Sequence, residues 1–164
     1  MTEILTTVVA VTLIVLGIII AFKFKGFFHK VISIGLAVLF GLVIFNILLA
    51  WIVSNQYIIT SISTGSFILF SLLSIVTFIY GLIVKDVSKF EKISILIMGV
   101  FVTVNIIFRW LHLPGAYIMK VYLIIPIIIT LASFLKVRKL TKEMSFMIFW
   151  LFHAIGELIT FWIK

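Results

Sequence analysis

Two short stripes of polar and ionisable side chains interrupt an otherwise apolar sequence, and their residue types are suited to proton or ion chemistry. Each stripe is spaced i, i+4 and i+7, which places its three members on one face of an α-helix. The stripes are Asn105, Arg109 and His112, and His153, Glu157 and Thr160. An ionised side chain within a bilayer costs about 2.5 to 3.5 kcal/mol on insertion scales, so these groups need a partner, a cavity or a role.

Three interpretations of the stripes remain open. Histidine titrates near neutral pH and burial can raise the pKa of a glutamate toward it, so the groups could relay protons. They could equally form a salt bridge that joins two helices, or a contact with another subunit. Enzyme motifs such as Gly-x-Ser-x-Gly, phosphate loops and dinucleotide fingerprints are missing from the sequence. Its three histidines lie on separate segments without metal-ligand spacing. We therefore expect no metal, no cofactor and no catalytic residue.

The elements that carry these stripes are predicted from composition. Apolar residues make up 65% of the 164 residues and charged residues only 11%, and the apolar runs are long enough to cross a bilayer. The sequence predicts one all-α transmembrane bundle over residues 1–164, with lipid as its surroundings. The expected spans are about 3–22, 31–54, 62–84, 93–112, 118–135 and 144–163. The net charge of +8 lies in short loops, which argues against a nucleic-acid partner.

The basic residues alternate between successive connections. The first, third and fifth connections hold ten of the thirteen Lys and Arg residues, whereas the connections around residues 55–61 and 113–117 hold none. By the positive-inside rule the basic connections are cytoplasmic, so both termini are expected outside. Several aromatic residues fall at the proposed outer boundary, in agreement with this orientation: Trp51, Tyr57, Trp110, Tyr117 and Trp162.

Depth within the bilayer predicts which polar groups meet. At 1.5 Å per residue, Arg109 lies about 24 Å and Glu157 about 20 Å from the inner ends of their helices, so the fourth and sixth spans are expected to pack through their stripes. Lys120 is expected to extend outward to the interface. Glu157 is the one acid expected well inside a span. The other acids are assigned to the first residues of the chain or to cytoplasmic loops: Glu3, Asp86, Glu91 and Glu143.

Two further positions carry local expectations. Pro126 should kink the fifth span because proline lacks the backbone N–H of a regular helix. His29, next to Phe27 and Phe28 in the first basic connection, is expected at the membrane surface as part of an interfacial anchor.

The corner after the fourth span carries a local resemblance. Residues 108–116 read FRWLHLPGA. This resembles the F-K-x-x-H-W-P-G-A corner of small Bacteroidota inner-membrane proteins, such as the membrane subunit of the gliding-motility and type IX secretion motor. In that family a basic residue, the histidine and a glutamate are implicated in using the proton gradient. Arg109 and His112 match two of these positions. The helix that follows has no acid, so Glu157 could supply one only from another helix.

From these observations we expect a small multi-pass subunit of a larger bacterial inner-membrane assembly, with proton linkage as one option. Other membrane subunits or further copies of the chain are the expected partners. The alternative is a small permease or ion carrier, and a membrane-embedded enzyme comes third.

Overall fold

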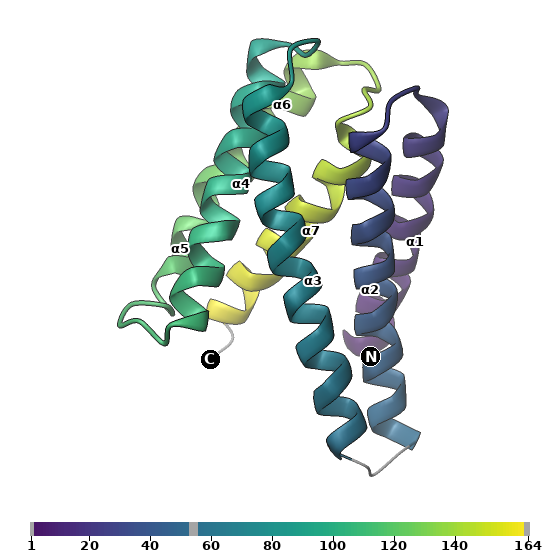
Figure 1. Cartoon of the computed structure of the whole chain (residues 1–164), viewed down its shortest axis with the longest axis vertical. Helices are drawn as coiled ribbons and strands as arrows, with labels where there is room; N and C mark the ends of the chain where they lie inside the picture. The colour runs from purple at the N-terminus through teal and green to yellow at the C-terminus, as the bar shows by residue number, and fades with distance from the viewer. Residues whose placement is uncertain (1, 53–55, 163–164) are drawn as a thin grey trace.

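The computed structural model describes residues 2–52 and 56–162, with the side chains of residues 2–7, 10, 51 and 160 left aside. Its described part is an all-α bundle, as the sequence predicts (Figure 1). The helices are α1 (Thr2–Lys23), α2 (Phe28–Ile52), α3 (Gln56–Ile83), α4 (Lys89–Trp110), α5 (Met119–Tyr122), α6 (Ile124–Val137) and α7 (Met144–Trp162).

Four segments are long and apolar enough to cross a membrane, namely Phe28–Ala50, Gln56–Ile83, Lys89–Trp110 and Met119–Val137. Within the described residues, α1 and α7 contribute shorter apolar stretches, Val11–Lys23 and Met144–Ile159. Large apolar side chains lie on the outer surface, including Ile52 at 83% exposure and Leu135 at 75%. A surface of this kind is stable against lipid and not against water. The chain is therefore a membrane protein.

The break expected in the fifth span lies between α5 and α6, at Leu123. Pro126 has no N–H to donate to the carbonyl of Tyr122 one turn earlier, so the regular bonding pattern cannot pass through this point. At Leu123, three residues earlier, the N–H bonds the carbonyl of Lys120 at 3.2 Å, a three-residue spacing in place of the four of a regular α-helix. This irregular turn divides the apolar segment Met119–Val137 into α5 and α6.

The connections alternate between the two ends of the bundle. The α1–α2, α3–α4 and α6–α7 connections, which hold the basic residues, all lie at the upper end in Figure 1. The α4–α5 connection, the start of α1 and the end of α7 lie toward the lower end. We call these the basic end and the terminal end.

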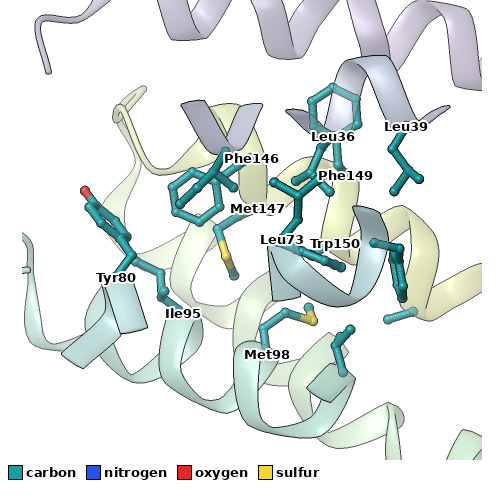
Figure 2. Close-up of a cluster of buried hydrophobic side chains, with 14 of the residues drawn as sticks. Leu36, Leu39, Leu73, Tyr80, Ile95, Met98, Phe146, Met147, Phe149 and Trp150 are labelled. Atoms are coloured by element: carbon teal, nitrogen blue, oxygen red, sulfur yellow. The ribbon is translucent and has the colours of Figure 1, made fainter. Parts of the chain in front are cut away.

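Helix α7 crosses the bundle diagonally and forms much of its centre (Figure 1). It packs mainly against α1, α2 and α6, and its end reaches α5 and α4. Phe146, Phe149 and Trp150 are buried in the core between these helices (Figure 2). The Trp150 indole N–H donates to Thr77 Oγ1 of α3 at 3.0 Å, so its one polar atom is satisfied. Close contact depends on Gly17, where an added Cβ would lie 2.2 Å from the Phe149 ring.

Candidate functional site

Three charged side chains meet near the terminal end of the bundle. Arg109 Nη1 of α4 lies 2.9 Å from Glu157 Oε1 of α7, and Lys120 Nζ of α5 lies 2.9 Å from Glu157 Oε2. The exposed fractions of these side chains are 43% for Arg109, 17% for Lys120 and 16% for Glu157. We call Arg109, Lys120 and Glu157 the ion cluster. The formal charges of these three side chains sum to +1.

The local fold explains how these charges meet. Pro114 and Gly115, the latter with φ of +91°, turn the chain sharply after α4, so α5 returns beside the end of α7. The Tyr117 hydroxyl donates to the carbonyl of Phe161 at 2.7 Å and holds the corner against α7. Lys120 follows one turn later and contacts the second carboxylate oxygen of Glu157.

The pairing of Arg109 with Glu157 agrees with the similar depths estimated from the sequence. The expectation for Lys120 is wrong, because this side chain is largely buried against Glu157 and does not extend outward. The fourth and sixth spans meet through this ion pair near their ends, and α7 packs mainly elsewhere. The stripes therefore meet at one pair and not along their whole length.

The other stripe residues have separate surroundings. Asn105 is 1% exposed, and His112 is an exposed corner residue in the left-handed conformation, with φ of 48°. The His153 ring contacts Phe70, with centroids 4.4 Å apart. The side chain of Thr160, the last member of the second stripe, is not among those that the structure describes. Only Arg109 and Glu157 among the described stripe residues thus belong to the ion cluster.

An open cavity of about 470 Å³ lies beside the ion cluster, between α2, α3 and α7. Apolar side chains form most of its walls, and Arg109 and Glu157 line it as well. Its apolar lining is Leu39, Phe40, Val43, Ile47, Phe67, Phe70 and Phe152, and its uncharged polar lining is Asn46, Ser63, Ser66 and His153. The polar stripes of the sequence include Arg109, His153 and Glu157 of this lining, and not Asn46, Ser63 or Ser66. Their common cavity could not be found from spacing within one helix.

Several polar atoms of this cavity lining have no hydrogen-bond partner among the described residues. These atoms are Asn46 Oδ1, Ser66 Oγ and His153 Nε2. The Asn46 amide N–H donates to Ser63 Oγ at 2.6 Å, which fixes the orientation of the asparagine. Buried polar atoms are usually satisfied, so these three atoms are exceptions among the residues that line the cavity.

A second polar group lies at the basic end. Glu143, 3% exposed, accepts a hydrogen bond of 2.9 Å from the Tyr80 hydroxyl and lies 3.8 Å from Lys142 Nζ. Glu91, 7% exposed, forms a capping box with Ser88 at the start of α4. We call Glu91 and Glu143 the buried carboxylates. They lie at the helix ends where the sequence places them, but burial within the protein was not expected.

Burial raises the pKa of the Glu143 carboxyl above its ordinary value. The hydrogen bond from Tyr80 and the charge of Lys142 oppose this rise, and the charge of Glu91 adds to it. A space of about 10 Å³ separates this carboxyl from Glu91, with Ser133 and Thr141 at its edge. The space at the basic end is therefore nearly closed, although Glu91 Oε1, Ser133 Oγ and Thr141 Oγ1 around it have no hydrogen-bond partner among the described residues.

His29 also departs from its expected position. It is 2% exposed, and its Nε2 lies 3.2 Å from the carbonyl of Ala21, whereas Phe27 and Phe28 beside it are exposed. The ring joins the end of α1 to the start of α2, so the interfacial position expected for His29 is wrong, and that of the two exposed phenylalanines stays a prediction.

Fold and site together define a class: an all-α membrane protein with a charged cluster at the edge of an open cavity. No group of three or more His, Cys, Asp or Glu residues suited to a metal ion occurs in the described part of the chain. Comparisons with protein-family models, with curated proteins and with solved structures found no match.

Proposed function

We propose that this chain is a small multi-pass protein of a bacterial inner membrane that binds a ligand inside the bilayer, as a permease or carrier does. One observation carries the proposal: the open cavity is lined by polar side chains from four helices and lies beside the ion cluster. Ligand sites are typically concave and mostly apolar, with a few convergent polar groups, and their volumes span roughly 300 to 1,000 Å³. The cavity fits this description.

The proposed orientation places the basic end in the cytoplasm and the terminal end outside. The clustering of the three basic connections at one end supports it (Figure 1). Reporter fusions after Lys139 and after Lys164 test the orientation, because they should report opposite sides of the membrane. The same side for both would contradict it.

Ligand binding is tested by filling the cavity. Gly156 lines the cavity, and a Cβ added there meets no atom within 4 Å, so Gly156→Leu should occupy the space without disturbing the bundle. Gly65 of α3 has equal space for a Cβ but does not line the cavity, so Gly65→Leu is the matched control. Native mass spectrometry of the purified chain should detect a bound small molecule in the wild type and in the control, and lose it in Gly156→Leu. The same bound species in all three proteins would contradict the proposal.

A second candidate is the proton-linked subunit of a larger inner-membrane assembly. The resemblance of residues 108–116 to the motor-protein corner favours it, together with the contact between Arg109 and an intramembrane glutamate. However, a carboxylate between two cations is well suited to remain charged and poorly suited to exchange protons. Mild purification from native membranes separates the two functions: a stoichiometric protein partner supports the subunit, and a chain that purifies alone supports the carrier.

A further inference from the structure

The ligand class can be inferred from the charge beside the cavity. Arg109 carries its positive charge at the cavity wall, whereas both carboxylate oxygens of Glu157 already contact cations. A guanidinium beside a mostly apolar cavity favours a ligand with an acidic group. Arg109 lines the cavity whereas Lys120 does not, so an anion in the cavity would meet the guanidinium first.

The geometry of Arg109 suits an acidic group. A guanidinium has five N–H donors in a planar fork, and its Nη1 donates to Glu157. Its carbon atom lies 5.9 Å from the centre of the Phe67 ring, which holds the guanidinium at the cavity wall. The remaining donors match carboxylate or phosphate oxygens, which arginine binds in bidentate fashion.

The rest of the cavity suits an apolar body with few polar atoms. Phe40, Phe67, Phe70 and Phe152 contribute aromatic walls from α2, α3 and α7. Ser66 is 6% exposed and lines the cavity, and its Oγ has no hydrogen-bond partner within the described ranges.

We infer that the open cavity binds an amphipathic anion, with its acidic group at Arg109 and its apolar chain along the phenylalanine walls. The inference rests on the proposed function, because it names the ligand class of the same cavity. The shared chemistry is one acidic group on an apolar chain, which describes both an acyl acid from the bilayer and a smaller organic acid from water.

The test compares an acid with its neutral analogue. The purified full-length chain in neutral detergent is titrated with a fluorescent fatty acid and with the corresponding fatty alcohol. The acid should bind the wild type at least tenfold more tightly than the alcohol, since a hydrogen bond to a charged group contributes about one to two powers of ten in affinity. Equal affinities for the two probes would overturn the inference.

Two pairs of variants locate the contact. Arg109→Gln should weaken acid binding about tenfold or more and leave alcohol binding unchanged, whereas Lys120→Gln, which alters the cluster outside the cavity lining, should weaken acid binding less. Gly156→Leu should abolish binding of both probes, and Gly65→Leu should leave both unchanged. The glycine pair leaves the ion cluster intact, so it remains informative if Arg109→Gln lowers the yield of folded protein.

The outcomes separate this inference from the proposed function. If both probes bind with equal affinity and Gly156→Leu abolishes their binding, the ligand cavity is supported, and the inference that its ligand is an anion is overturned. Probe binding that survives Gly156→Leu overturns both. Displacement of the bound acid by oleate in phosphatidylcholine vesicles assigns the bilayer as the source, and displacement by octanoate in buffer assigns the aqueous phase.

Discussion

The two ends of the bundle use acidic side chains in opposite ways. At the terminal end, Glu157 contacts two cations at 2.9 Å beside an open cavity of about 470 Å³. At the basic end, Glu91 and Glu143 are more deeply buried, and their hydrogen bonds come from the Ser88 and Tyr80 hydroxyls around a space of about 10 Å³. The carboxylate beside the open cavity contacts two cations, whereas the carboxylates around the closed space accept hydrogen bonds from hydroxyl groups. This difference favours binding at the terminal end and helix anchoring at the basic end.

The largest expected effect is that of Glu157→Gln. This change removes the carboxylate that pairs with both Arg109 and Lys120, so the free energy of unfolding should fall by about 3 kcal/mol, the lower end of the cost for breaking a buried pair because Arg109 is partly exposed. Thermal unfolding in detergent and membrane abundance measure the effect. Adding Lys120→Gln should recover part of the loss, since it removes the excess cation. Normal abundance with normal ligand binding would make Glu157 incidental.

Glu143 should respond to shape more than to charge. Glu143→Gln keeps an acceptor for the Tyr80 hydroxyl and should change the unfolding free energy by less than about 1 kcal/mol. Glu143→Leu leaves that buried hydroxyl without its acceptor and should cost about 2 kcal/mol. The same unfolding assay measures both variants. A larger loss in Glu143→Gln than in Glu157→Gln would reverse the contrast between the two ends.

The pH dependence of stability should reflect Glu143. The pKa of Glu143 is raised in the folded protein, chiefly by burial, so folding favours the protonated carboxyl. The stability that this group contributes is therefore fully present below the ordinary carboxyl pKa and is lost as the pH rises through the raised folded pKa. Besides burial, the neighbouring groups that shift the pKa of Glu143 are Tyr80 of α3, Lys142 next to it in the sequence and Glu91 of α4. The free energy of unfolding, measured from acidic to neutral pH, should fall more steeply in the wild type than in Glu143→Gln. Parallel curves would contradict this assignment.

The smallest effect is expected at the corner. His112 has a φ of 48°, a left-handed conformation that residues with a side chain rarely adopt. His112→Gly should relieve this strain, but glycine loses more backbone entropy on folding, so the two effects should nearly cancel. Stability should change by less than about 1 kcal/mol. Acid binding should be unchanged because His112 does not line the cavity. A loss of acid binding in this variant would bring His112 back into the functional site and strengthen the proton-linked alternative.

The sequence predicts the helices and part of the site for a clear physical reason. Apolar runs and helical spacing are local, so the all-α bundle and the shared depth of Arg109 and Glu157 follow from them. Lys120, His29 and the buried carboxylates depend on which helix lies beside which. The course of α7 brings Glu157 to Lys120, and the start of α7 brings Glu143 to Tyr80; neither contact can be read from periodicity.

The central place of α7 has a consequence for how the protein is made. This helix follows the other six along the chain, so it leaves the ribosome and enters the bilayer after them. Until it arrives, Gly17 lacks the Phe149 ring that packs on it, Ser33 lacks its hydrogen bond to Ser145, and Thr77 lacks the Trp150 indole. A translation intermediate halted before Met144 therefore exposes polar groups of α2 and α3 to lipid. Completion of this core therefore waits for the insertion of α7, and the packing of α1, α2 and α3 against it is a late event in folding.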